Sequence, residues 1–213
     1  MREVVFNTED KIVSKNFLRS DSKKYKEKRK AELVSEKRKA ELVSRMNNEI
    51  RCLTTLQESF INEPEINHYP FPKLLSYKDY ILKLTYCGES MDHIFLRAPH
   101  GAPSVLGIKK DYSIKISTEY LNKTIECIIN NLTINNILHG DLHHNNICIN
   151  DNNIYLIDFD RPYDNQHVNV SRKLVAQRHT LRLIGWDLLF LQKNPQQYRY
   201  IWYNEYNIAH GGE

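Results

Sequence analysis

Three oxygen-bearing side chains in the segment 137–160 have the types and spacing of a metal and phosphate site. Asp141 and Asn146 lie in a polar loop, and Asp158 ends an apolar run that follows the turn-forming residues 150–153. Because this turn joins two short β-prone runs, we predict a hairpin that returns Asp158 to the neighbourhood of Asp141 and Asn146. Two carboxylates and a carboxamide form a hard oxygen-donor site, which suits Mg²⁺ with phosphate oxygens completing its shell.

The same segment resembles the catalytic and metal loops of the protein-kinase-like superfamily. The run HGDLHHNN matches the pattern H-x-D-L-x-x-x-N, and IDFD stands where the family has its D-F-x metal loop. The resemblance implies that Asp141 orients the hydroxyl of an acceptor and that Asn146 holds one Mg²⁺. It also implies that Asp158 bridges Mg²⁺ and the phosphates of ATP, with His139 and Phe159 as packing supports.

Two details of the motif are more similar to small-molecule phosphotransferases than to protein kinases. His143 stands where Ser/Thr protein kinases normally carry lysine, and Asp160 stands in place of the glycine of D-F-G. The combination is similar to the aminoglycoside and choline kinase group. Residues 155–161 look like the lipopolysaccharide-core sugar kinases, notably the 3-deoxy-manno-octulosonate kinase group. His143 and His144 are alternative ligands of a transition metal, but the sequence shows no further ligand set for one.

The resemblance therefore implies an ATP- and Mg²⁺-dependent phosphotransferase. Its expected partners are the nucleotide and a hydroxyl-bearing acceptor, with a sugar, a lipid or another small molecule favoured. A serine/threonine protein kinase is the alternative. The sequence leaves the identity of the acceptor and the oligomeric state open.

A kinase-like site also needs a lysine on the nucleotide phosphates and a glutamate that fixes this lysine. Lys15 lies in a predicted strand and resembles the lysine, with Lys11 as a rival. Glu49 lies in a predicted helix and resembles the glutamate, with Glu41 as a rival. The resemblance thus implies a nucleotide site that includes Lys15 and Glu49.

The predicted hinge between two lobes lies at residues 86–87. By the resemblance, the backbone of Tyr86 and Cys87 would bind the adenine edge of ATP. Asp187 resembles a helix residue that anchors the catalytic loop backbone, although an ordinary surface aspartate explains it equally well. The chain contains no G-x-G-x-x-G motif, which in the family covers the phosphates. This departure motivates a further hypothesis, a pseudokinase or interaction protein that lacks turnover.

The elements that position these residues indicate an α+β, two-lobed fold of the protein-kinase-like kind. Residues 1–86 are expected to form a reduced N-lobe with a small sheet and a long basic helix. Residues 87–213 are expected to form a mainly helical C-lobe. Within residues 88–116, which no clear pattern assigns, Pro99, Gly101 and Pro103 suggest loop. The predicted strands lie at 4–6, 12–17, 74–77 and 80–86, and the predicted helices at 22–60, from Ser117 onward and at 181–191.

Charge and composition argue against several other classes of protein. The net charge of +4 comes mainly from the run 23–45, where residues 27–35 are repeated identically as 36–44. Glutamates interleave with the basic residues of this repeat, which favours a solvated helix over nucleic-acid binding. No apolar run approaches the ~20 residues that span a bilayer, and no signal peptide begins the sequence. The four cysteines form no C-x-x-C pair. We therefore expect a soluble, cytoplasmic or otherwise intracellular protein.

Overall fold

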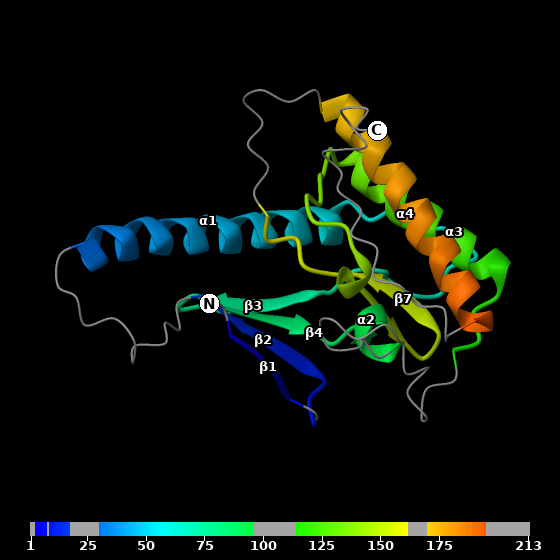
Figure 1. Ribbon diagram of the computed structural model, residues 1–213, viewed down its shortest axis with the longest axis horizontal. Helices are drawn as coiled ribbons and strands as arrows, with labels where there is room; N and C mark the ends of the chain where they lie inside the picture. The colour runs from blue at the N-terminus through cyan, green and yellow to red at the C-terminus, as the bar shows by residue number, and fades with distance from the viewer. Residues whose placement is uncertain (1–2, 8, 18–29, 96–113, 162–169, 195–213) are drawn as a thin grey trace.

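The N-terminal part of the chain forms an antiparallel sheet with one long helix lying across it (Figure 1). The computed structural model describes residues 3–7, 9–17, 30–95, 114–161 and 170–194. The elements of this first part are β1 (Glu3–Asn7), β2 (Ile12–Asn16), α1 (Lys30–Glu58), β3 (Leu74–Lys78) and β4 (Ile81–Thr85). The strand order is β1-β2-β4-β3, so β4 pairs with β2 and β3 in the interior of the sheet.

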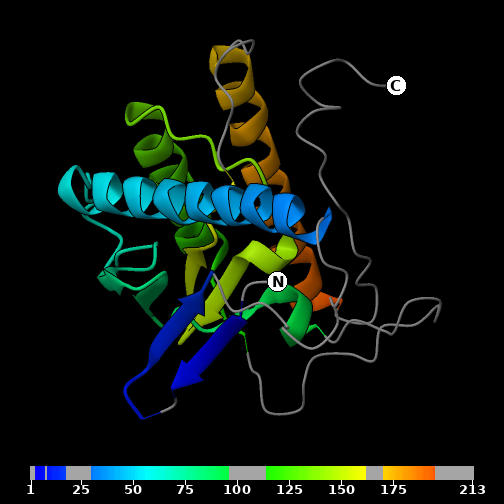
Figure 2. The same cartoon turned by 90° about the vertical axis from the view of Figure 1, so that its left-hand side faces the viewer.

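The rest of the described chain is mainly helical and carries a second, smaller sheet. Its elements are β5 (Glu89–Ser90), α2 (Met91–Ile94), α3 (Thr118–Ile134), a 3₁₀ turn (His144–Asn146), β6 (Ile147–Asn150), β7 (Asn153–Leu156) and α4 (Val170–Lys193). Strands β5, β6 and β7 pair in that order, all antiparallel. Helices α3 and α4 pack side by side beyond this sheet (Figures 1 and 2).

The α+β, two-lobed architecture that the sequence predicts is confirmed. At the start of residues 88–116, for which the sequence suggests only loop, β5 and α2 form; Pro99, Gly101 and Pro103 lie outside the described residues. Strand β5 has only two residues and exists because it pairs with β6, a partner that no local pattern reveals. Helix α4 begins at Val170 rather than at residue 181. Residues 22–29 of the predicted first helix lie outside the described residues, and the lobe boundary after residue 86 stays a prediction.

Two tight turns set the register of the strands beside the site. Asp79 and Tyr80 have φ angles of 49° and 64° between β3 and β4, and Asp151 and Asn152 have φ angles of 50° and 63° between β6 and β7. Positive φ at both central residues is the mark of a type I′ turn, whose twist matches that of a hairpin. The hairpin predicted around residues 150–153 is therefore confirmed and directs the chain to Asp158. The strands predicted at residues 74–77 and 80–86 also pair as a hairpin.

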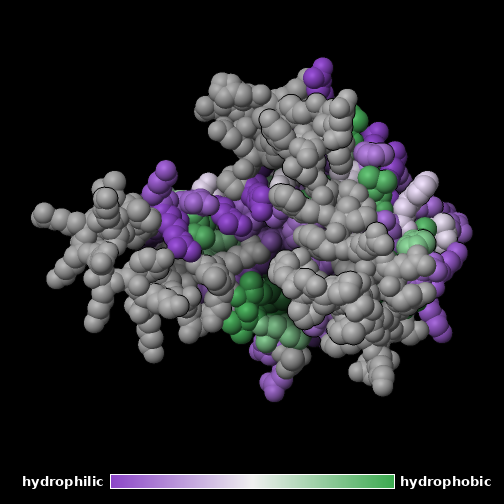
Figure 3. Space-filling model, viewed as in Figure 1, coloured by the Kyte–Doolittle hydropathy of each residue, from purple (hydrophilic) through white to green (hydrophobic). Residues whose placement is uncertain are grey.

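Helix α1 packs an apolar stripe against the core, and the face of the helix that Figure 3 shows is mostly hydrophilic. Met46, Leu53 and Leu56 lie on the buried stripe, and Glu49 lies among them with no exposed surface. A charged residue inside an apolar stripe requires a partner, because burying an unpaired carboxylate is unfavourable. The fold thus places one carboxylate of α1 in the interior. Within the described ranges, none of the helices has both the length and the apolarity that crossing a bilayer requires.

Candidate active site

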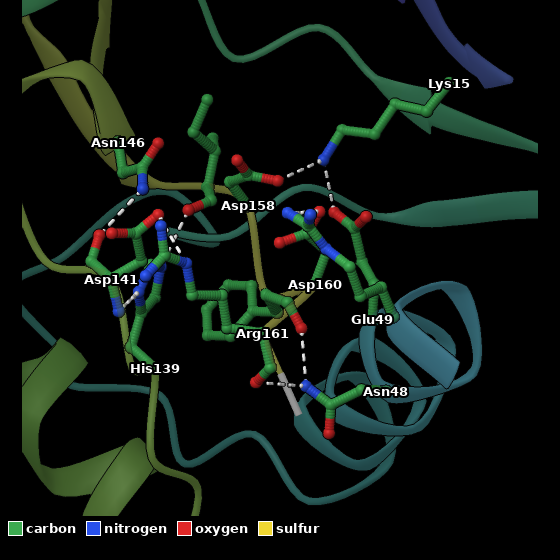
Figure 4. Close-up of polar contacts among 12 residues, drawn as sticks. Lys15, Asn48, Glu49, His139, Asp141, Asn146, Asp158, Asp160 and Arg161 are labelled. Atoms are coloured by element: carbon green, nitrogen blue, oxygen red, sulfur yellow. Dashed lines mark hydrogen bonds and ion pairs between the residues drawn. The ribbon is translucent and has the colours of Figure 1, made fainter. Parts of the chain in front are cut away.

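Two loops on either side of the β6–β7 hairpin bring the predicted oxygen donors together (Figure 4). The first loop covers residues 139–146 and the second covers residues 158–161. Asn146 Nδ2 donates a hydrogen bond of 2.8 Å to the backbone oxygen of Asp141, and the N–H of Ile157 donates one of 2.9 Å to the backbone oxygen of Asn146. The amide nitrogen of Asn146 is therefore turned toward Asp141, which leaves Oδ1 as the side-chain atom that can bind a cation.

His139 connects the two loops from the inside of the protein. Its Nε2 lies 2.8 Å from the carbonyl oxygen of Ile157, and its Nδ1 accepts a hydrogen bond of 3.3 Å from the N–H of Asp141. A carbonyl can only accept, so Nε2 carries the proton and the ring is neutral. Complete burial lowers the pKa of His139, which stabilises this neutral form. His139 thus holds the backbone next to Asp141 and the residue before Asp158.

The Asp141 carboxylate faces two basic side chains. Arg161 Nε lies 3.0 Å from Asp141 Oδ2, and His143 Nε2 lies 3.6 Å from the same oxygen. Burial opposes ionisation of Asp141, but the neighbouring His143 and the charge of Arg161 together hold the pKa of Asp141 below its usual range. Asp141 is therefore a carboxylate at neutral pH and can accept a hydrogen bond from a hydroxyl.

Lys15 joins the sheet to both α1 and the 158–161 loop (Figure 4). Its Nζ contacts Glu49 Oε1 and lies 3.1 Å from Asp158 Oδ1. All three residues are buried, and they come from β2, α1 and the segment after β7. The rival residues Lys11 and Glu41 are both exposed. The structure thus brings together the lysine and the glutamate that the sequence favours, with Asp158 as a third member.

Helix α1 also contacts the 158–161 loop through residues that the sequence reasoning missed. Asn48 Nδ2 donates hydrogen bonds of 2.7 Å to the Phe159 oxygen and 2.9 Å to the Arg161 oxygen. Arg45 Nη2 lies 2.7 Å from Asp160 Oδ2. Asp160 is almost completely buried, so the residue that stands in place of the glycine of D-F-G has a structural partner. A signal was present, because Arg45, Asn48 and Glu49 share one helical face at i, i+3 and i+4.

Asp158 has an unusual backbone conformation. Its φ angle is 73°, in the left-handed region that residues with a Cβ seldom adopt. Such a conformation costs on the order of 1–3 kcal/mol and persists where surrounding contacts enforce it. Here Lys15 contacts the Asp158 side chain and Asn48 contacts the next carbonyl along the chain. Contacts with the side chain of Asp158 and with the backbone of the next residue therefore hold this conformation.

The predicted hinge residues lie at the end of β4. The N–H of Tyr86 donates a hydrogen bond of 2.9 Å to the Lys11 oxygen, so this group belongs to the sheet and is not free for an adenine ring. The Tyr86 ring stacks on Phe6 at a centroid distance of 4.2 Å. Cys87 is buried, and burial raises the pKa of its thiol to about 12. The adenine-binding role of Tyr86 and Cys87 stays a prediction.

Helix α4 contacts the 139–146 loop through two residues. Asp187 Oδ2 lies 3.2 Å from Nε2 of His144, so it contacts a side chain of the loop. Gln177, which the sequence reasoning missed, contacts the backbone at the start of the loop. Its Oε1 accepts a hydrogen bond of 2.7 Å from the N–H of His139, and its Nε2 donates one of 3.0 Å to the Ile137 oxygen. Gln177 thus contacts the backbone at the start of the loop, and the same role for Asp187 stays a prediction.

The donor set fits Mg²⁺ better than a transition metal. Asp158 and Asn146 offer carboxylate and amide oxygens, and Mg²⁺ takes its remaining ligands from water and phosphates. Among the described residues there is no group of three or more His, Cys, Asp or Glu side chains that could hold a metal ion. His143 and His144 contact Asp141 and Asp187, respectively. The alternative of a histidine-rich transition-metal centre therefore has no support in the described part of the chain.

Comparisons with known proteins find matches among solved structures only. No family model matches the sequence, and no curated protein matches it. Among solved structures, a MAP kinase from Leishmania major is similar with a TM-score of 0.46 and 17% sequence identity. The match covers 99% of this chain and 58% of the kinase, so the chain spans just over half of that protein's length.

Proposed function

We propose that the protein is an ATP- and Mg²⁺-dependent phosphotransferase that acts on the hydroxyl of a small molecule. The observation that carries the proposal is the buried contact of Lys15 with both Glu49 and Asp158. These residues come from three segments far apart in the sequence, and they meet beside the loop that holds Asp141 and Asn146. A lysine held by one carboxylate next to a second, cation-binding carboxylate is the arrangement that positions a polyphosphate.

Each residue has a distinct role in the proposed reaction. Lys15 would bind the phosphates of ATP, and Glu49 would keep its ammonium group in place. Asn146 Oδ1 and the Asp158 carboxylate would hold Mg²⁺, which supplies charge neutralisation on the transferring phosphoryl group when it is bound. Asp141, ionised at neutral pH, would accept a hydrogen bond from the acceptor hydroxyl and direct its oxygen toward the phosphate.

The proposal of a small-molecule acceptor is supported by the two departures from protein kinases. His143, in place of lysine, contacts Asp141 Oδ2, and Asp160, in place of glycine, is buried against Arg45. Both residues therefore have partners in the site. This is expected if His143 and Asp160 belong to a small-molecule phosphotransferase site, and it is not expected if they result from the loss of a protein-kinase motif. A serine/threonine protein kinase remains the alternative, and transfer to a generic protein substrate but to no small molecule would establish it.

The test is phosphate transfer from ATP over a panel of sugars, lipids and proteins, using purified protein. Asp141→Asn and Asp158→Asn should each lower the rate by on the order of 10³-fold, because orientation and charge stabilisation dominate this chemistry. Asp151→Asn is the matched control, since Asp151 is exposed in the β6–β7 turn. If all three variants transfer phosphate at the wild-type rate, the assignment of the two loops is wrong.

A pseudokinase is the second candidate, and the missing G-x-G-x-x-G motif favours it. Without the backbone N–H groups of that motif, phosphate alignment depends on Lys15 and the metal ion. A thermal shift with Mg²⁺-ATP separates the candidates, because a ligand that binds the native state raises the unfolding midpoint. A shift without transfer to any acceptor would support the pseudokinase, whereas a shift with transfer would exclude it.

A further inference from the structure

Gln177 occupies a buried position on the apolar stripe of α4. It lies on the same helical face as Leu181, Ile184 and Leu188, and only 2% of its surface is exposed. A buried amide is unfavourable unless its donor and its acceptor are both satisfied. Leucine or methionine would fill the space without this requirement. Packing alone therefore does not explain a glutamine at position 177.

Both ends of the Gln177 amide contact the backbone of one short segment. The oxygen accepts from the N–H of His139, and the nitrogen donates to the carbonyl of Ile137. The carbonyl of one residue and the N–H of the residue two positions later are the pair that an extended chain presents along one edge, as in a parallel ladder. Gln177 therefore acts as a neighbouring strand would, and it fixes the conformation of the chain just before the 139–146 loop.

The segment that Gln177 holds determines where both carboxylates of the site lie. The His139 backbone is fixed by Gln177, while the His139 ring contacts the N–H of Asp141 and the carbonyl of Ile157. Ile157 directly precedes Asp158. A shift of His139 would therefore move Asp141 and Asp158 relative to each other. Misplacement of reacting groups by about 1 Å is enough to cost on the order of 10²-fold in rate.

We propose that Gln177 is a positioning residue, which sets the geometry of Asp141 and Asp158 through His139. This inference rests on the proposed phosphotransferase function for its kinetic consequences. Its structural consequence is independent of that function. Without Gln177, the backbone of His139 is no longer held in place, so the ring no longer keeps both of its contacts. The ring then exchanges between its two neutral tautomers.

The experiment compares Gln177→Met with Thr180→Val, a matched control. Thr180 is also fully buried on α4, but its hydroxyl donates to the Ala176 oxygen within the helix. Thr180→Val should lower the thermal midpoint by about 2–4 °C, because it removes one buried hydrogen bond. Gln177→Met should lower it further, because it removes two hydrogen bonds to buried backbone groups. Gln177→Met should lower kcat by about tenfold to a hundredfold with the KM for ATP unchanged. Thr180→Val should keep kcat within about twofold of the wild type.

Nitrogen NMR of the His139 ring gives a readout that does not require activity. The wild type and Thr180→Val should show one tautomer with the proton on Nε2, and Gln177→Met should show both. If the wild type transfers no phosphate, the proposed function fails, and the ring signal still decides the role of Gln177. A single tautomer together with a wild-type kcat in Gln177→Met would overturn the inference.

A second variant keeps the inference testable if Gln177→Met does not fold. Gln177→Glu keeps an acceptor for the N–H of His139 and, at a pH at which its carboxyl is ionised, places an acceptor instead of a donor against the Ile137 oxygen. It should lower kcat by about threefold to tenfold and broaden the ring signal of His139. Unchanged kcat and an unchanged ring signal in this variant would again overturn the inference.

Discussion

Removal of either partner of the Lys15–Glu49 pair should strongly destabilise the protein. Lys15 Nζ lies 3.1 Å from Asp158 Oδ1 and also contacts Glu49, and each contact of this kind is worth about 5 kcal/mol at an effective dielectric constant of about 20. Desolvation offsets much of this gain. Breaking a buried pair nevertheless costs about 3–5 kcal/mol, because it leaves a buried charge without compensation.

The measurement is a double-mutant cycle in urea, with Lys15→Met, Glu49→Leu and the two changes combined. Each single variant should lose about 3–5 kcal/mol of unfolding free energy. The double variant should lose clearly less than the sum, because the two apolar side chains remove both charges at once. Lys11→Met and Glu41→Leu are the matched controls, since both positions are exposed. Their expected effect is within about 0.5 kcal/mol.

This reasoning is refuted if each single variant loses less than about 1 kcal/mol of unfolding free energy, because an exposed ion pair contributes no more than this. Strict additivity in the cycle would refute it as well, because additivity means that the two side chains do not interact. Mg²⁺-ATP adds a functional arm to the test. It should raise the unfolding midpoint of the wild type but not that of Lys15→Met, if Lys15 binds phosphate.

Three further predictions concern the backbone, the charge and the pH response of the protein. A Cβ on Gly88 would lie 1.9 Å from the Ile149 oxygen, and the φ angle of Gly88 is 95°. Gly88→Ala should therefore lower the free energy of unfolding in urea by at least about 3 kcal/mol. A loss below about 1 kcal/mol would contradict the close approach of Gly88 to Ile149. Arg161 helps to lower the pKa of Asp141, so Arg161→Met should move the acid limb of the pH profile of kcat/KM to higher pH. An acid limb at unchanged pH would show that Arg161 and Asp141 do not form an ion pair. Burial lowers the pKa of His68, so the unfolded chain binds its proton first and stability should fall as the pH drops through about 6.5. In His68→Gln the difference between the urea midpoints at pH 7.5 and pH 5.5 should shrink, and an equal difference would contradict the assignment.

The local elements were predictable because short-range rules govern them. The turn residues 150–153 indicated the β6–β7 hairpin, and Ser117 indicated the start of α3, whose N-cap it is. Strand β5 and helix α2 were missed because two paired residues and one helical turn leave no periodic pattern.

The side chains that support the site were harder to predict than those that compose it. Asn48 and Gln177 have no motif, and each is a polar residue on a helical face that faces the core. Their partners are backbone groups far away in sequence, from Phe159 and Arg161 in one case and from Ile137 and His139 in the other. Such contacts depend on how a helix is oriented against a loop. The hydrophobic periodicity of a helix indicates which of its faces is buried, but it does not indicate which segment of the chain packs against that face.

Residue types and spacing were sufficient to name Asp141, Asn146 and Asp158, because a turn of known geometry connects their segments. The resemblance to the protein-kinase-like superfamily favoured Lys15 and Glu49 over Lys11 and Glu41 without excluding the rivals. The choice was made by the packing of α1 on the sheet, which buried one lysine and one glutamate next to Asp158 and left the others in solvent. Burial, and with it the strength of a charge interaction, is a property of the assembled layers and is not encoded in any short window of the chain.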